Sequence, residues 1–152
     1  MSRILVVCLG NICRSPLAEG VLLHFVSANK LNLTIDSAGT SDYHIGQAPD
    51  LRTIANAKKH KIDLSPLRAR QFVSSDFDEF DRIFVMDKSN YANVLNLARH
   101  EQDKLKVDLF LNILHPGKNM EVPDPYYGGE AGFENVFNLV WEASEKLINE
   151  YK

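Results

Sequence analysis

The fold of this chain follows from the stretch Cys8-Leu9-Gly10-Asn11-Ile12-Cys13-Arg14-Ser15-Pro16. An apolar run, Ile4-Leu5-Val6-Val7, comes directly before it and is short, β-branched and free of polar alternation, as buried strands are. After it, Ser15 suits the N-cap of a helix and Pro16 suits the first helical position. We therefore expect a loop that joins the carboxyl end of a strand to the amino end of a helix.

Such a loop is a site for an anion, because backbone N–H groups and the positive end of the helix dipole meet there. We expect the planar fork of Arg14 to grip two oxygens of a tetrahedral phosphate. Cys8 would lie beneath the central atom, where the arginine and the helix end favour its thiolate. The pattern predicts a cysteine nucleophile that attacks phosphorus. The expected phosphate-binding residues are Leu9, Gly10, Asn11, Ile12, Cys13, Arg14 and Ser15.

A structural interpretation of Cys8 also has to be weighed. Cysteine is a common small residue of protein cores, and the spacing Cys-x5-Arg arises by chance in ordinary sequences. The context favours the catalytic interpretation, because a strand precedes the motif, Gly10 lies inside it, and Ser15-Pro16 opens a helix behind it.

The bulk properties indicate one globular domain over residues 1–152. The chain is 45% hydrophobic and 24% charged, which is ordinary for such a domain, and its net charge of −3 gives no general affinity for polyanions. We therefore expect no nucleic-acid partner. No apolar stretch reaches 18 residues, and no signal peptide follows Arg3, so we expect no membrane insertion. Two cysteines make no disulfide framework, which favours the cytoplasm, although secretion without a signal peptide remains open.

Hydrophobic periodicity predicts alternating strands and helices. We expect strands over residues 33–38, 82–86 and 107–111 in addition to the first one. Helices are expected over 16–28, 50–59 and 133–151, with a further helix capped by Asp87 and a short one opening at Ser65-Pro66 and running through Arg70. This alternation predicts an α/β domain with a parallel sheet covered on both faces. The site of such a sheet lies at the carboxyl ends of its strands, where Cys8 is expected.

The motif from Val7 to Pro16 resembles the phosphate loop of the low-molecular-weight protein tyrosine phosphatases. The resemblance continues at Asp36-Ser37-Ala38-Gly39-Thr40 and at Asp124-Pro125-Tyr126, and it covers the chain in order and length. It implies a single-domain, flavodoxin-like sandwich with a four-stranded parallel sheet. It also implies an enzyme that needs neither a metal nor an organic cofactor.

A phenolate leaves phosphate poorly, so the reaction needs a proton donor. Asp124 is a candidate, since Pro123 and Pro125 stiffen the backbone on both sides. From the residues alone it is equally well an aspartate in a turn. The resemblance implies that Asp124 is the general acid, which then acts as the base when water attacks the cysteinyl-phosphate.

The resemblance implies several further roles. Asn11 would take a left-handed conformation, held by Ser15, Ser37 and His60. Ser15 would also donate a hydrogen bond to Cys8. Cys13 would form a reversible disulfide with Cys8 on oxidation, protecting the nucleophile. The residues expected to wall the entrance and stack on a substrate ring are Tyr43, Tyr126 and Tyr127.

The expected partner is therefore a phosphotyrosine-containing protein, bound by a monomer. A protein-arginine phosphatase is an alternative, but such proteins resemble this family with threonine at the position of Ile12, and the bulkier Ile12 favours phosphotyrosine. A thiol-dependent arsenate reductase shares the loop but needs additional cysteines, and none follows Cys13. A phosphate-binding module without catalysis would need neither Cys8 nor Asp124.

Overall fold

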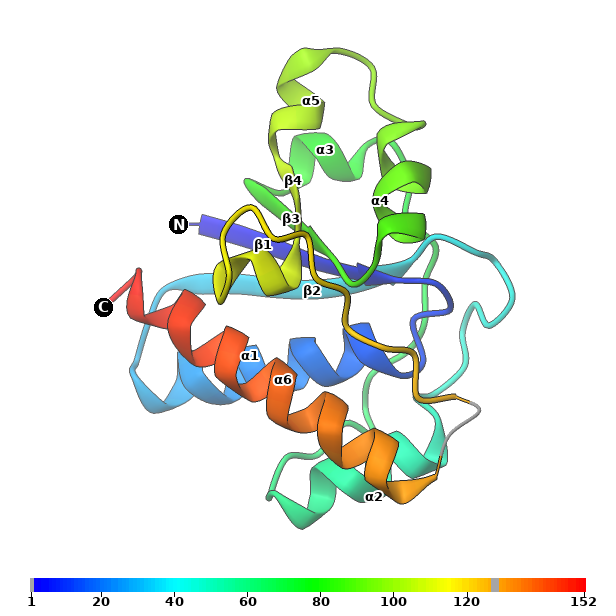
Figure 1. The fold of residues 1–152 in the computed structure, drawn as a ribbon, viewed down its shortest axis with the longest axis vertical. Helices are drawn as coiled ribbons and strands as arrows, with labels where there is room; N and C mark the ends of the chain where they lie inside the picture. Colours follow the sequence, from blue (N-terminus) through cyan, green and yellow to red (C-terminus); the bar gives the residue numbers. More distant parts are fainter. Residues whose placement is uncertain (1, 127–128) are drawn as a thin grey trace.

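The computed structural model describes residues 2–126 and 129–152 and contains a four-stranded, entirely parallel sheet with the strand order β2-β1-β3-β4. The strands are β1 (Ser2–Cys8), β2 (Leu33–Gly39), β3 (Arg82–Val85) and β4 (Val107–Leu109). Helices cover both faces of the sheet (Figure 1). This confirms the predicted single-domain α/β sandwich.

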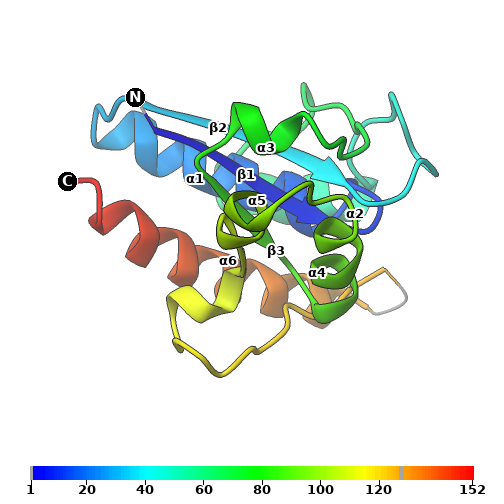
Figure 2. The ribbon, with the colours of Figure 1, turned by 90° about the horizontal axis from the view of Figure 1, so that it is seen from above.

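The helices divide into two groups. On one side of the sheet lie α1 (Arg14–Ala28), α2 (Leu51–Lys59) and α6 (Glu130–Asn149), with the 3₁₀ turn η1 (Phe110–Ile113) packed against α6. On the other side lie the shorter helices α3 (Asp76–Glu79), α4 (Lys88–Leu95) and α5 (Glu101–Leu105), as the view from above shows (Figure 2).

The central strand β1 is buried on both faces. Ile4, Val6 and Cys8 face the core beneath α1 and α6, whereas Leu5 and Val7 face the core beneath α4. Because side chains alternate along a strand, a continuous apolar run is what a two-sided core requires. This burial fixes the position of Cys8, the last residue of the strand.

Two expected helix positions were wrong. Helix α1 begins at Arg14 with Cys13 at its N-cap, so Ser15 and Pro16 lie inside the first turn and not at the cap. Pro16 is tolerated there because the first N–H groups of a helix have no partner within the helix. The short helix expected from Ser65 through Arg70 does not form: Ser65 and Pro66 lie in a turn, residues 67–70 have no regular secondary structure, and Gln71 forms a bridge with Gly39 at the end of β2.

Other boundaries differ by a few residues. The strand expected to reach residue 111 ends at Leu109, where η1 begins, and helices α3 and α5 were not expected. Helix α6 begins three residues earlier than predicted, at Glu130, and ends at Asn149. The predicted cap at Asp87 is confirmed, since its carboxylate accepts the backbone N–H of Asn90. No helix among the described residues is long and apolar enough to span a membrane.

Candidate active site

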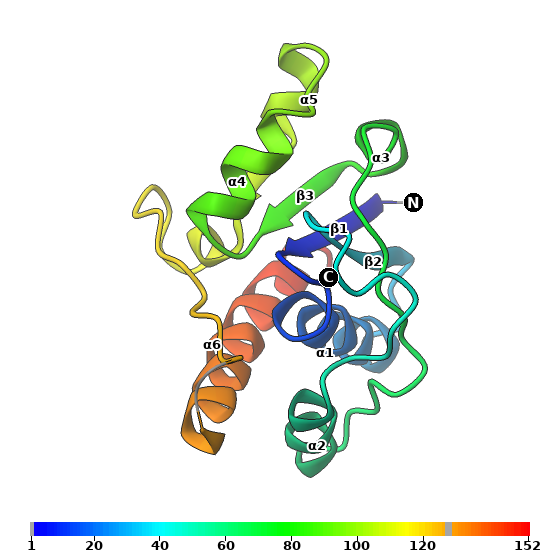
Figure 3. The same cartoon turned by 90° about the vertical axis from the view of Figure 1, so that its right-hand side faces the viewer.

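The connection between β1 and α1 forms a tight loop, here called the Cys8 loop (residues 8–14), which faces the viewer in Figure 3. Asn11 lies in the left-handed region, with φ of 56°. The loop packs directly on Gly39, where a Cβ atom would lie 2.8 Å from the carbonyl oxygen of Leu9. Only glycine fits at that position of β2, so the backbone of β2 supports the strained loop.

The carbonyl groups of the Cys8 loop are bonded from outside it. The oxygens of Cys8, Leu9 and Ile12 accept backbone N–H groups at 2.9, 3.0 and 2.8 Å, respectively. The donors are Thr40, Ser41 and Asp50. Because a trans peptide group points its C=O and N–H in opposite directions, the N–H groups that follow these carbonyls point away from the donors. This arrangement suits the binding of an anion.

The Cys8 thiol is 2% exposed and has two polar neighbours. The backbone N–H of Asn11 donates to Sγ over 3.3 Å, and Ser15 Oγ lies 3.0 Å from Sγ. Asn11 Nδ2 donates to the hydroxyl oxygens of Ser15 and Ser37, at 2.8 and 2.9 Å. Since Ser15 Oγ accepts that bond, its own proton is available to Cys8.

His60 lies elsewhere, contrary to the expectation that it supports Asn11. Its Nε2 is 2.6 Å from Glu134 Oε1, and its ring stacks on Phe137 with the centroids 3.7 Å apart. No hydrogen bond among the described residues joins it to Asn11; the third partner of that side chain is the backbone N–H of Arg70, which donates to Oδ1 over 3.0 Å. The sequence offers no signal for this backbone contact.

Arg14 is 2% exposed, and its guanidinium is held on one side. Nη1 donates to Asp87 Oδ2 over 2.8 Å and to the carbonyl oxygen of Val122 over 3.0 Å. Burial lowers the pKa of Arg14, but negative charge at Cys8 and the bonded carboxylate of Asp87 outweigh it and raise the pKa above its usual value. Asp87 was predicted only as a helix cap, so its second role was missed.

Asp124 reaches the same place from the far end of the chain. Its Oδ2 lies 3.7 Å from Arg14 Nη2, and its Oδ1 accepts the backbone N–H of Tyr126 over 3.0 Å. The Asp124 side chain is 43% exposed, which leaves it accessible to solvent and to a substrate. The three residues predicted as catalytic thus meet although 110 positions separate Arg14 from Asp124.

These groups line one pocket of about 220 Å³, together with Tyr43, His44 and Tyr126. Tyr43 is largely exposed, as a residue at the mouth of a site would be. His44 packs so close to Gly10 that a Cβ there would lie 3.0 Å from its ring. Tyr127, the third expected wall residue, lies outside the described residues.

Cys13 and Cys8 are both free, buried thiols. Burial raises the pKa of Cys13 to about 12. Cys13 is therefore a protonated thiol at neutral pH, and its disulfide with Cys8 remains a prediction. No three of the described His, Cys, Asp and Glu side chains gather as metal ligands.

Comparison with known proteins identifies a family with a similar sequence. The model of the family described as low molecular weight phosphotyrosine protein phosphatase matches residues 3–152. The low molecular weight phosphotyrosine protein phosphatase of Schizosaccharomyces pombe is 42% identical over 149 residues, covering 96% of this chain and 94% of the relative. The human protein of the same name is 42% identical over 137 residues, covering 88% and 85%.

Solved structures agree with this relationship. The crystal structure of protein tyrosine phosphatase from Entamoeba histolytica, with Hepes in its active site, superimposes with a TM-score of 0.92 at 42% identity and covers 99% of this chain and 96% of that one. The drosophila arginine phosphatase superimposes with a TM-score of 0.90 at 31% identity, covering 100% and 98%.

Proposed function

The chain belongs to the low molecular weight phosphotyrosine protein phosphatase family, a class of protein-tyrosine-phosphatases, and we propose that it hydrolyses phosphotyrosine in proteins, and small aryl phosphates, through a cysteinyl-phosphate. The observation that carries the proposal is the meeting of Cys8, Arg14 and Asp124 at one pocket. They supply a nucleophile, a cationic phosphate ligand and a proton donor, which are the groups that the reaction requires.

In the first step, the Cys8 thiolate attacks phosphorus and an S–P bond forms as the P–O bond to the phenol breaks. The Asp124 carboxyl group gives its proton to the departing oxygen, so a neutral phenol leaves. Arg14 stabilises charge on the equatorial oxygens. Because Nη1 is held by Asp87 and Val122, the edge of the guanidinium carrying Nη2 is the one that faces Asp124 and the pocket.

In the second step, water attacks the phosphorus of the cysteinyl-phosphate and gives a proton to the Asp124 carboxylate. The S–P bond breaks, inorganic phosphate is released, and the thiolate and the protonated Asp124 are restored. The N–H of Asn11 and the hydroxyl of Ser15 lie at hydrogen-bond distance from Sγ, so they stabilise the leaving thiolate.

The walls of the pocket favour an aromatic phosphate ester. Ile12 places an apolar side chain in the lining, and Tyr43 and Tyr126 offer rings on which a phenol ring can stack. The structural likeness to the drosophila arginine phosphatase makes phosphoarginine the second candidate substrate. Ile12 separates the two, because its apolar group offers no hydrogen bond to a guanidinium. The two free thiols support a reducing compartment, which we take to be the cytoplasm, and we propose a monomer.

The test is hydrolysis of p-nitrophenyl phosphate by the wild type and by Cys8→Ser, with EDTA present and with or without reductant. Turnover in the reduced wild type that disappears in the variant supports the proposal; activity that persists in Cys8→Ser overturns it. Rates on a phosphotyrosine peptide and a phosphoarginine peptide then identify the substrate. We expect phosphotyrosine to be preferred and Ile12→Thr to move the ratio toward phosphoarginine.

A further inference from the structure

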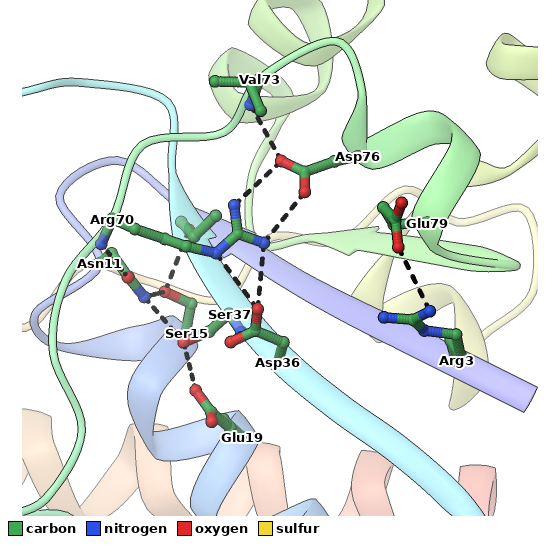
Figure 4. Close-up of polar contacts among 11 residues, drawn as sticks. Arg3, Asn11, Ser15, Glu19, Asp36, Ser37, Arg70, Val73, Asp76 and Glu79 are labelled. Carbon is green, nitrogen blue, oxygen red and sulfur yellow. Dashed lines mark hydrogen bonds and ion pairs between the residues drawn. The ribbon is translucent and has the colours of Figure 1, made fainter.

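Arg70 lies in the segment that was expected to be a short helix. This segment runs beside the end of β2, where the N–H of Gly39 donates to Arg70 O over 2.8 Å and the N–H of Phe72 donates to Gly39 O over 2.7 Å. Gly39 is also the residue on which the Cys8 loop packs. The backbone of Arg70 therefore lies directly beside Gly39, which supports the Cys8 loop, and beside Asn11 of that loop (Figure 4).

The N–H of Arg70 fixes the direction of the hydrogen bonds around Asn11. It can only donate, so Asn11 must turn its Oδ1 toward it and its Nδ2 toward the two serines. The Ser15 oxygen is then an acceptor, and its proton is left for Cys8 Sγ at 3.0 Å or for the carbonyl oxygen of Ala38 at 3.4 Å. The shorter contact favours the sulfur.

The guanidinium of Arg70 holds this segment in place. Its Nη1 and Nη2 each lie 3.1 Å from an oxygen of Asp76, and its Nη2 also lies 3.1 Å from Asp36 Oδ2. Asp76 is 5% exposed and also accepts the N–H of Val73 over 2.9 Å. We call these three side chains, Asp36, Arg70 and Asp76, the Arg70 clamp (Figure 4). Asp36 lies in β2 and Asp76 is the first residue of α3, so the clamp joins the segment around Arg70 to both elements.

We propose that Arg70 is a positioning residue for the nucleophile: the Arg70 clamp keeps its N–H against Asn11 and so directs the Ser15 hydroxyl at Cys8 Sγ. The inference rests on the proposed function, because it assigns Arg70 to the reaction of Cys8. Arg70 is not among the residues that line the pocket, and the proposed path runs from its N–H through Asn11 and Ser15.

The chain contains a matched control. Arg99 also joins two aspartates, with bonds of 2.7 and 2.8 Å to Asp78 and of 2.9 and 3.2 Å to Asp103, which is 2% exposed. Like Arg70, it loses bonds to two carboxylates when it is replaced by glutamine. Its partners lie in α3 and α5, away from the Cys8 loop. Arg70→Gln and Arg99→Gln therefore both remove an arginine that bridges two carboxylates. Only Arg70→Gln affects a residue whose backbone N–H binds Asn11.

The experiment measures two quantities at 25 °C on both variants and the wild type: kcat for p-nitrophenyl phosphate, and the rate of Cys8 alkylation by iodoacetamide against pH, with the modified cysteine identified by peptide mass. For Arg70→Gln, we expect kcat to fall by about tenfold and the pH of half-maximal alkylation to rise by about half a unit, since a weaker hydrogen bond stabilises the thiolate less. For Arg99→Gln, we expect less than a twofold change in kcat and no change in the alkylation profile.

Equal losses in the two variants, or an unchanged alkylation profile in Arg70→Gln, would overturn the inference. If Arg70→Gln does not fold, Asp36→Asn carries the test, because it removes the negative charge of one arm of the clamp and leaves the pair with Asp76. A smaller change in the same direction is expected, and no change would count against Arg70. Alkylation needs no turnover. A wild type that is alkylated but does not hydrolyse p-nitrophenyl phosphate therefore contradicts the proposed function alone.

Discussion

The carboxylate of Asp87 binds two different groups: its Oδ2 accepts Nη1 of Arg14 at 2.8 Å, while its Oδ1 accepts the N–H of Asn90 at 2.8 Å and caps α4. Asp87, which follows the carboxyl end of β3 by two residues, thereby fixes the arginine at the start of α1. The Asp87 side chain thus caps α4 and also orients the guanidinium of Arg14. Its carboxylate explains why Arg14 is almost fully buried and yet charged.

Asp87→Asn should separate these two roles. Asparagine keeps an oxygen for the cap but loses the charge that holds Arg14, so helix α4 stays capped while the guanidinium is less well oriented. We expect kcat/KM for p-nitrophenyl phosphate to fall by about tenfold to a hundredfold. Urea unfolding should show a smaller loss of stability in Asp87→Asn than in Asp87→Ala, which also removes the cap. Equal stability in the two variants would show that the cap contributes nothing.

Asp124→Asn tests the proton donor. An amide cannot give a proton to the departing phenol, so turnover should fall by about a hundredfold or more. The loss should be greater for phenyl phosphate than for p-nitrophenyl phosphate, because the nitro-substituted phenolate is more stable and needs a proton less. Steady-state kcat on both substrates measures this difference. An equal loss on both would indicate that Asp124 positions the substrate and does not protonate the leaving group.

The strand-loop-helix unit around Cys8 was predictable because its signals are local. The apolar run before Cys8 indicates a buried strand wherever the rest of the chain lies, and the loop motif resembles one family closely. Asp87 and Asp124 show the limit of such reasoning. Asp87 was predicted only as a helix cap, and Asp124 was predicted as the proton donor from its flanking prolines and the family resemblance. Their contacts with Arg14 bridge 73 and 110 positions and depend on the packing of the sheet.

The prediction of a helix around Arg70 was wrong for a related reason. Ser65-Pro66 is a typical start of a helix, but β2 is an edge strand, and at its end Gly39 offers an N–H and a C=O that a non-helical backbone can satisfy and a helix cannot. Tertiary hydrogen bonding therefore overrode the local signal. His60 was misplaced because a histidine at the end of a helix carries no sequence mark of its partner, which proved to be Glu134 on α6.

Cys13→Ser should abolish recovery from peroxide. Peroxide oxidises the Cys8 thiolate to a sulfenic acid and is reduced to water; the Cys13 thiol then displaces water from it and a disulfide forms. Because burial keeps Cys13 protonated, we expect disulfide formation to be slower than the first oxidation. The variant should be driven to the sulfinic acid, which dithiothreitol does not reduce. Activity after dithiothreitol, with the mass of the Cys8 peptide, measures this; full recovery in Cys13→Ser would contradict the predicted disulfide.

Glu19 should make the stability of the protein fall as pH rises toward neutrality. Its carboxyl group is buried on α1 and accepts the Ser37 hydroxyl at 2.5 Å. Burial raises its pKa from 4.5 to about 7, against the Ser37 hydrogen bond; the charge of Asp36 raises it further and that of Arg70 lowers it. Below pH 4.5 the folded and unfolded chains both hold the proton. Between 4.5 and about 7 only the folded chain holds it, so the free energy of unfolding decreases with pH, by about 3 kcal/mol in total.

Glu19→Gln removes this titration while keeping an oxygen that can accept the Ser37 hydroxyl. Urea unfolding of both proteins at pH 5 and pH 8 measures the effect. The variant should gain stability relative to the wild type as pH rises, by roughly 2 to 3 kcal/mol between these values. Glu145→Gln, on the exposed face of α6, serves as the control and should show no such gain. If Glu19→Gln and the wild type change in parallel between pH 5 and pH 8, the buried carboxyl group is already ionised at pH 5, and the network behind Cys8 carries a negative charge throughout.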